Sequence, residues 1–154
     1  MRFGLVVAAA ALIFDRLAKI LLMDLMRGFP GGIEVTPFFN LVMVWNRGIS
    51  FGLFSSDAEV MRWVLIVLTL AIVVLLLWWL RQADGRWLAA AFGLMIGGAL
   101  SNAGDRLFYG AVADFFDFHL YGYHWPAFNF SDTAIVAGVA VLLVDALFGS
   151  REKD

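Results

Sequence analysis

The sequence contains no cysteine and few charged residues. The absence of cysteine excludes disulfides, thiolate metal ligands and a cysteine nucleophile. Charged residues make up 16% of the 154 residues and the net charge is −2, so no basic stripe indicates a nucleic-acid partner. Hydrophobic residues instead reach 62%, with a mean hydropathy of +0.85, whereas soluble domains contain roughly 45–50% apolar residues. The chain is therefore predicted to be an integral membrane protein with a single domain over residues 1–154.

Four apolar stretches are each long enough to cross a bilayer as a helix, which takes about 20 residues. They predict an all-α bundle of four transmembrane helices over residues 4–23, 63–80, 87–104 and 131–148. Helices are expected because lipid offers no water to satisfy backbone polar groups. The first stretch could also be a cleaved signal peptide, but no polar cleavage region follows it, and Asp15, Arg16 and Lys19 interrupt it. We therefore interpret it as a retained helix.

The basic residues set the expected orientation in the membrane. Arg2, the turn at 81–86 and the tail at 151–153 place five Lys or Arg on one side of a four-span protein. Short loops rich in Lys and Arg stay in the cytoplasm, so both termini are predicted to be cytoplasmic. The two longer connections, residues 24–62 and 107–130, are then predicted to be extracytoplasmic.

Both extracytoplasmic segments are unusual for loops. Residues 33–54 are rich in β-branched and aromatic residues and predict a small β-sheet on the membrane surface, with a turn at 46–48. Residues 108–128 are strongly aromatic and predict an outer loop in the membrane interface that covers the site below it. His119 and His124 lie in this loop, but their spacing and the lack of a third ligand argue against zinc.

Polar residues interrupt the first and third apolar stretches. Asp15 and Lys19 are four residues apart, so they share one helix face, and an ion pair buried between helices is expected. Asn102, Asp105 and Arg106 share the outer end of the third helix. Arg106 is expected to neutralise a neighbouring carboxylate and to bond backbone carbonyls of an outer loop. Such groups are costly in a bilayer, so each is a functional hypothesis.

The two glycines that precede this group, Gly97 and Gly98, predict close approach between helices.

Asp114 and Asp132 are the strongest candidates for chemistry. Asp132 could simply cap the fourth helix, and Asp114 could be an ordinary loop acid. Asp114, however, has no lysine or arginine within seven residues. Together with Asn46, Asn129 and the polar groups of the first and third helices, both aspartates are expected at the outer membrane level. Five separated segments that meet at one depth indicate a site.

Five sequence blocks resemble the lipoprotein signal peptidases, the type II signal peptidases of bacteria. The blocks are DRLAK from Asp15, FNLVMVWNRGISFG from Phe39, GGALSNAGDR from Gly97, VADF from Val112 and PAFNFSD from Pro126. They occur in order and span most of the chain. The departures are small side chains: Ala18 replaces a usual hydroxyl residue, Ser101 a common glycine and Ser131 a usual alanine.

The resemblance implies an aspartic endopeptidase of the bacterial inner membrane. Such enzymes remove signal peptides from prolipoproteins by cutting before a cysteine that bears diacylglycerol, and cyclic peptide antibiotics such as globomycin inhibit them. By motif, Asp114 and Asp132 would be the catalytic dyad. The supporting positions would be Asp15, Lys19, Asn46, Gly48, Asn102, Asp105, Arg106 and Asn129.

Two carboxylates that share one proton can hydrolyse an amide without a metal or a cofactor. The ionised carboxylate takes a proton from water, while the protonated one polarises the scissile carbonyl. Asn46 and Asn129 are reasonable donors to the resulting oxyanion. We expect the protein to act as a monomer on lipid-modified precursors at the surface of the lipid bilayer.

Three other interpretations use the same residues. A Ser/Lys peptidase would pair Lys19 with Ser50 or Ser131, and replacing each serine by alanine would distinguish it. A proton-coupled carrier or channel could use the buried acids, although four spans without inverted repeats argue against it. A structural scaffold would leave the clustered acids unexplained.

Overall fold

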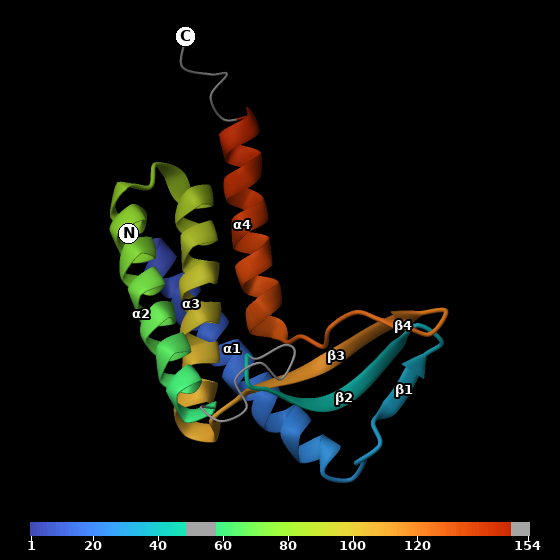
Figure 1. Ribbon diagram of the computed structural model, residues 1–154. Helices are drawn as coiled ribbons and strands as arrows, with labels where there is room; N and C mark the ends of the chain where they lie inside the picture. Colours follow the sequence, from blue (N-terminus) through green and yellow to red (C-terminus); the bar gives the residue numbers. More distant parts are fainter. Residues whose placement is uncertain (49–57, 149–154) are drawn as a thin grey trace.

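The computed structural model describes residues 1–48 and 58–148, and Figure 1 shows a bundle of long helices with a small sheet that extends sideways. In chain order the elements are α1 (Arg2–Met26), β1 (Ile33–Thr36), β2 (Phe39–Asn46), α2 (Ala58–Gln82), α3 (Gly85–Tyr109), β3 (Val112–Leu120), β4 (Tyr123–His124) and α4 (Phe130–Phe148). The four helices match the predicted apolar stretches and extend beyond most of them by a few residues. Ser50 lies outside the described residues, as does the rest of the predicted sheet segment after residue 48.

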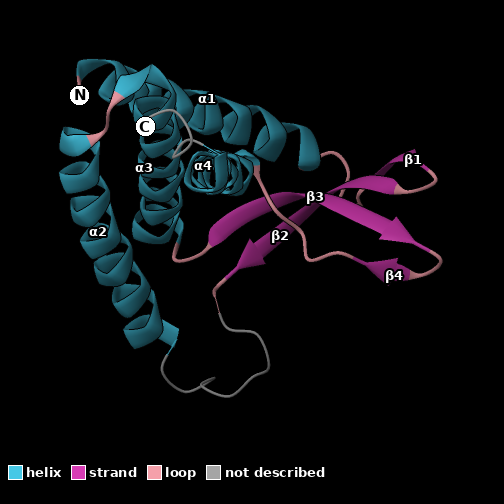
Figure 2. Ribbon diagram, turned by 90° about the horizontal axis from the view of Figure 1, so that it is seen from above, coloured by secondary structure: helices cyan, strands magenta, loops and turns pink. Residues whose placement is uncertain are grey.

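Helix α3 is the centre of the bundle and packs against the other three helices. Figure 2 looks along α4 and shows α3 between α2 and α4. The predicted close approach at the two glycines is confirmed. A Cβ at Gly97 would lie 2.4 Å from the backbone oxygen of Ala8 in α1, and one at Gly98 would lie 2.5 Å from that of Ser131 in α4. Only glycine allows these backbones to come so near.

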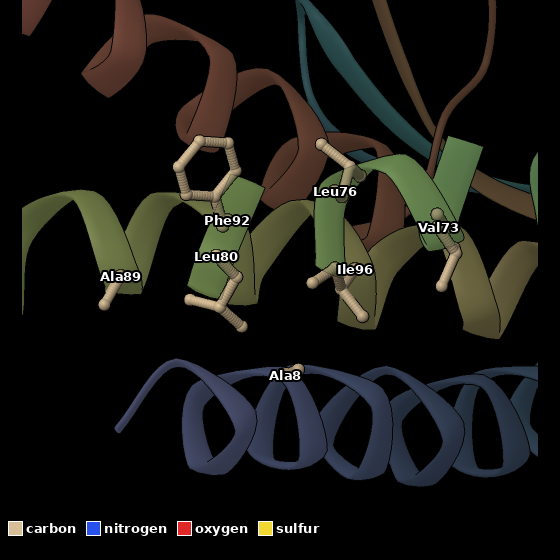
Figure 3. Close-up of a cluster of buried hydrophobic side chains, with 8 residues drawn as sticks. Ala8, Val73, Leu76, Leu80, Ala89, Phe92 and Ile96 are labelled. Atoms are coloured by element: carbon tan, nitrogen blue, oxygen red, sulfur yellow. The ribbon is translucent and has the colours of Figure 1, made fainter. Parts of the chain in front are cut away.

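A hydrophobic core fills the space between α1, α2 and α3, and Figure 3 shows its side chains. The buried members are Ala8, Val73, Leu76, Leu80, Ala89, Phe92, Ile96 and Ala99. Many large apolar side chains on the outer surfaces of the helices are exposed. That distribution fits helices surrounded by lipid.

Three of the described helices are long and apolar enough to cross a membrane: Glu59–Gln82, Gly85–Tyr109 and Phe130–Phe148. Helix α1 is as long as α2 but is not among them, because every stretch of span length in it includes Asp15, Arg16 and Lys19. Three of the four expected spans are thus matched by helices that are long and apolar enough. A membrane crossing by α1 stays a prediction.

The strands form one antiparallel sheet in the order β1-β2-β3-β4. The predicted strands in residues 33–46 are present. The prediction of an aromatic outer loop was wrong, because β3 belongs to that segment and pairs along β2, with Asp114 opposite Val44. The alternation of side chains in Val112–Leu120 suits a strand buried on both faces at its start. The segment therefore supplies part of the site instead of covering it.

Candidate active site

The candidate dyad is held by one residue that contacts both of its members. The side-chain Nδ2 of Asn129 donates to Asp114 Oδ1 at 2.7 Å, and the backbone N–H of Asn129 donates to Asp132 Oδ2 at 3.1 Å. Asp114 comes from strand β3 and Asp132 from the first turn of α4. The structure thus brings together two aspartates that are 18 positions apart in the sequence.

The start of α4 explains how Asp132 is placed. The backbone N–H of Asp132 donates to Asn129 Oδ1 at 3.0 Å, while its carboxylate accepts from the backbone N–H of Asn129. This reciprocal pair is a capping box, in which the residue before the helix and the third helical residue satisfy each other's backbone donors. The alternative role of Asp132 as a helix cap is therefore real, and it uses only Oδ2. Its other oxygen, Oδ1, faces Asn102.

Asn102 joins the dyad to the charged residues of α1. Its Nδ2 donates to Asp132 Oδ1 at 2.8 Å, and its Oδ1 accepts from Lys19 Nζ at 3.2 Å. A lysine ammonium can only donate, so it fixes which way the amide of Asn102 points. The amide hydrogens of Asn102 must then face the carboxylate of Asp132.

Lys19 is the centre of a buried ionic cluster. Its Nζ lies 2.9 Å from Asp15 Oδ2 and 2.6 Å from Asp105 Oδ2, and all three side chains are at most 2% exposed. The predicted ion pair between Asp15 and Lys19 is confirmed. Arg16 pairs with the other oxygen of Asp105. Two carboxylates thus meet two cations, a balance that buried charges require.

The ionic cluster also holds the strand that carries Asp114. Asp105 Oδ2 accepts from the backbone N–H of Ala113 at 3.3 Å, and Asn129 Nδ2 donates to the backbone oxygen of Ala113 at 3.2 Å. Both backbone groups of the residue before Asp114 are therefore fixed. The charges of α1 and α3 position the dyad without contacting its carboxylates by an ion pair.

Two contributors to the cluster were missed in the sequence. Ser101 Oγ donates to Asp15 Oδ2 at 2.5 Å, and Arg16 pairs with Asp105. Helical spacing carried a signal for both, since Arg16 lies three residues before Lys19 and Ser101 lies four before Asp105. Asp15 also accepts from the backbone N–H of Ser131 at 2.9 Å, so it faces other helices as expected.

The expectation for Arg106 is met only at longer range, because its charge interacts with Asp132, Asp114 and Asp105 without a direct ion pair. Its Nη1 contacts the backbone oxygen of Asn102 in its own helix at 3.5 Å, and no carboxylate in residues 1–48 and 58–148 forms an ion pair with it. Arg106 shares a face with Asn102, one turn away, whereas Asp105 points toward α1. The carbonyls at the end of α3 are instead bound by Arg62, which donates to the oxygens of Arg106 and Leu107 at 2.7 Å each.

Asn46 and Gly48 close the outer side of the site. The backbone N–H of Gly48 donates to Asn46 Oδ1 at 2.8 Å, and Gly48 has φ of +75°. This hydrogen bond and this φ confirm the predicted turn at residues 46–48, and a positive φ is one that glycine adopts without strain. A Cβ on Gly48 would lie 3.6 Å from an Arg106 nitrogen and 2.4 Å from Leu65. The side chain of Asn46 also hydrogen-bonds the carboxyl of Asp114.

The environment of Asp114 suits proton transfer. The pKa of this carboxyl is raised from 3.8 to about 6, chiefly by burial and further by the negative charge of Asp132. Hydrogen bonds from Asn46 and Asn129 and the charge of Lys19 oppose this rise without cancelling it. A carboxyl with a pKa of about 6 can both hold and release a proton near neutral pH.

An apolar cavity reaches the site from between the helices. It has a volume of about 240 Å³ and is lined by Thr69, Ile72, Leu76, Met95, Ala99, Asn102, Arg106 and Ile135. Its walls come from α2, α3 and α4, and its polar end is formed by Asn102 and Arg106. An aliphatic group in this cavity would lie beside the dyad.

The two histidines lie away from the site, and Lys19 does not fit the alternative role of a general base. His119 and His124 face each other across β3 and β4, away from the dyad, with ring centroids 4.9 Å apart. Lys19 contacts three acceptors, which are Asp15, Asp105 and Asn102, so its three donors are all used. A lysine so engaged is a poor general base for Ser131.

These features define a helical membrane protein with two neighbouring carboxylates at one end of its bundle, Asp114 buried and Asp132 half-buried. The sequence profile of the family described as signal peptidase (SPase) II matches residues 7–148. A lipoprotein signal peptidase of Nitrobacter hamburgensis is 46% identical over 151 residues, covering 95% of this chain and 92% of that protein. One of Aeromonas hydrophila is 42% identical over 150 residues, covering 96% and 89%.

Solved structures agree. A bacterial membrane enzyme determined by the in meso method at 2.3 Å resolution superposes with a TM-score of 0.81 at 27% identity, covering 98% of this chain and 91% of that one. A second, at 1.9 Å resolution, has a TM-score of 0.80 at 28% identity, covering 94% and 92%. The chain belongs to the signal peptidase II family, and its apolar helices and relatives identify a bacterial membrane protein.

Proposed function

We propose that the protein is an aspartic endopeptidase that removes signal peptides from prolipoproteins, cutting before the diacylglyceryl-modified cysteine. Its membership of the signal peptidase II family and its relatives, named lipoprotein signal peptidases, support the peptidase activity and the prolipoprotein substrate. The observation that carries the aspartic mechanism is the sharing of Asn129 between Asp114 and Asp132. No other pair of carboxylates in the described residues has this arrangement without a cation bonded to either.

In the proposed reaction Asp114 and Asp132 share one proton. The ionised carboxylate takes a proton from the attacking water, and the protonated carboxyl polarises the scissile carbonyl and later gives its proton to the leaving nitrogen. The negative charge of Asp132 raises the pKa of Asp114, which favours a single proton held at Asp114. No cofactor or metal is needed for these steps.

In the proposed reaction Arg106 or Asn46, and not Asn129, donates to the oxyanion. Asn129 Nδ2 already contacts Asp114 Oδ1, the backbone oxygen of Ala113 and Asn102 Oδ1. Arg106 has a buried Nε that lacks a partner among the described residues, and its charge interacts with both aspartates. Asn46 has already placed its Oδ1 on Gly48, which leaves its amide hydrogens directed at the site.

The apolar cavity supports a lipid-bearing substrate. In the proposed complex an acyl chain enters sideways from the bilayer between α2 and α4, while the scissile bond meets water at the dyad. Burial of an aliphatic chain contributes about 0.8 kcal/mol per methylene, so the lipid would supply much of the affinity. We further propose four membrane spans, with α1 as the first, both termini in the cytoplasm, a monomeric enzyme and inhibition by cyclic peptides such as globomycin.

The test uses purified protein and a lipidated precursor in detergent micelles. Asp114→Asn and Asp132→Asn should each abolish cleavage, since an amide cannot exchange the proton, while the thermal unfolding of the protein stays cooperative. Asp117→Asn is the matched control, because this acid lies three residues further along β3, where Asn40 and His124 bind it. It should keep its activity. Substantial turnover by either dyad variant would remove that residue from the catalytic role.

A further inference from the structure

The apolar cavity beside Asn102 has a closed end inside the helix bundle. Helices α2 and α3 run antiparallel and are joined by a short turn, as Figure 1 shows. Thr69 of α2 and Asn102 of α3 line the cavity far from that turn, whereas Leu76 of α2 and Met95 of α3 are the lining residues nearest to it. The cavity therefore runs along the helices from Asn102 to the level of Leu76 and Met95.

An aromatic layer lies directly behind this end of the cavity. The rings of Trp79 and Phe92, which are three residues beyond Leu76 and Met95 along their helices, have centroids 6.3 Å apart. Phe92 is buried together with Leu80 in the hydrophobic core, where Figure 3 shows both beside Leu76. The cavity thus cannot continue toward the turn between α2 and α3 without displacing these side chains.

The side chain of Met95 closes the cavity between α3 and α4. A Cβ on Gly138 of α4 would lie 2.5 Å from Met95 Cγ and 3.3 Å from Met95 Sδ. The thioether therefore lies against the bare backbone of α4, and only a glycine at position 138 leaves room for it there. Methionine suits such a place, because its flexible side chain fills irregular gaps. Met95 and Leu76 together form the floor of the cavity.

The cavity is shorter than a membrane acyl chain. Asn102 and Met95 are seven positions apart on α3, which corresponds to about 10 Å at about 1.5 Å per residue. One leaflet of the hydrocarbon core is about 15 Å deep, which is half of the whole core. A chain of leaflet length that enters at Asn102 must therefore leave the cavity before its end. It can return to lipid between α2 and α4, which flank α3 in Figure 2.

We propose that Met95 is a specificity-determining residue, which limits how many methylenes of the substrate's acyl chain the protein contacts. The inference rests on the proposed function, in which the cavity holds one acyl chain. A chain too short to reach the floor leaves a void, and the lining of a void loses dispersion contacts. Methylenes beyond the floor exchange one apolar environment for another and add no affinity. Affinity should therefore rise with chain length and then become constant at a length that Met95 sets.

The test measures binding and not cleavage. Full-length protein carrying Asp114→Asn is titrated in detergent micelles with a fluorescent peptide of the precursor cleavage region. The cysteine of the peptide bears diacylglycerol with butanoyl, octanoyl, dodecanoyl or hexadecanoyl chains, and anisotropy gives each dissociation constant. Met95→Ala removes the floor. Leu94→Ala is the matched control, because Leu94 is the neighbour of Met95 on α3 but lines a different cavity, between α1 and α4.

With Met95 present, affinity should rise several-fold from butanoyl to octanoyl and change little from dodecanoyl to hexadecanoyl. Met95→Ala should extend the several-fold rise to hexadecanoyl, while Leu94→Ala keeps the original dependence on length. Ala99→Val is a second variant, in case Met95→Ala does not fold. Ala99 lines the cavity one turn nearer to Asn102, so the added methyl groups should make affinity constant at a shorter chain length.

An unchanged length dependence in Met95→Ala, or the same change in Leu94→Ala, would overturn the proposal. So would an unchanged dependence in Ala99→Val. Cleavage of the lipidated precursor by protein with Asp114 intact is measured in parallel. Normal cleavage with a length dependence that ignores Met95 would refute this inference alone. Absence of cleavage with a length dependence that responds to Met95 would refute the proposed peptidase reaction and leave the acyl floor in place.

Discussion

The two groups of acids at the site, Asp15 with Asp105 and Asp114 with Asp132, are stabilised in different ways. Asp15 and Asp105 each have a cation within ion-pair distance, from Lys19 or Arg16. The carboxylates of the dyad have amides instead, from Asn102 and Asn129. A cation holds a carboxylate firmly in its charged form, whereas an amide leaves the proton free to come and go. The first arrangement suits a support, and the second suits acid–base chemistry.

The largest expected effect on stability comes from the ionic cluster around Lys19. Lys19→Ala should lower the free energy of unfolding by about 3–5 kcal/mol, because it leaves two buried carboxylates with one cation fewer. Activity should fall along with stability, since Asn102 loses the donor that orients it. Denaturant unfolding in detergent measures the first effect and cleavage of lipidated precursor the second. Lys19→Met is the matched control, which keeps most of the volume and loses only the charge. Full stability with loss of the chemical step alone would favour the Ser/Lys mechanism.

Asp114 has no ion pair of the kind that Asp15 and Asp105 form, so its titration should make the stability of the protein depend on pH. The folded pKa of Asp114 is about 6, above an unfolded value of about 3.9. The folded state therefore binds the proton more tightly, so the contribution of Asp114 to stability is fully present below pH ~4 and is lost as pH rises through ~6. The size is about 3 kcal/mol, at about 1.36 kcal/mol per pKa unit.

The free energy of unfolding is measured for the wild type and for Asp114→Asn between pH 4 and 7. The difference between the two proteins gives the contribution of Asp114, because the histidines contribute equally to both. The variant should lack the decline in stability across this range. A parallel decline in both proteins would show that Asp114 does not titrate there.

A smaller effect is expected when one amide is removed from the dyad. Asn129→Ala removes the helix cap of α4, worth about 1 kcal/mol, and the hydrogen bond that lowers the pKa of Asp114. The turnover rate should fall far more than stability does. The alkaline limb of the pH–rate profile should move to higher pH, because the pKa of Asp114 rises and this carboxyl then keeps the shared proton to a higher pH. An unchanged alkaline limb would show that Asp114 does not hold that proton.

The smallest effect is expected at an exposed ion pair, which completes the comparison. Arg27 and Asp24 form an ion pair whose side chains are 82% and 77% exposed. Arg27→Ala should change the free energy of unfolding by less than about 1 kcal/mol, because water already solvates both charges. A loss comparable to that of Lys19→Ala would mean that burial does not explain the difference between the pairs.

The sequence predicted local features of the fold better than remote ones. The four helices follow from apolar runs, and the ion pair of Asp15 with Lys19 follows from helical spacing. Strand β3 was interpreted as an aromatic loop, because its pairing partner β2 lies more than 60 residues earlier and no local pattern connects them. The same limit explains why Asp114 and Asp132 could be chosen as candidates, while their shared contact with Asn129 could not be predicted.

The errors at charged residues have a similar cause. Arg106 and Asp105 are adjacent, so helical spacing sends them to different sides of α3, but it does not say which neighbour lies on each side. Only the packing shows that Asp105 meets Arg16 and Lys19 of α1. It also shows that Arg106 lines the cavity toward α2.

The glycine contacts of α3 join it more closely to α1 and α4 than to α2. Gly97 and Gly98 bring α3 into backbone contact with α1 and α4, so these three helices behave as one stiff body. Helix α2 meets α3 through flexible side chains such as Leu76 and Leu80. We expect any widening of the cavity beside Arg106 to come from α2, because side chains, and not close backbone contacts, join it to α3.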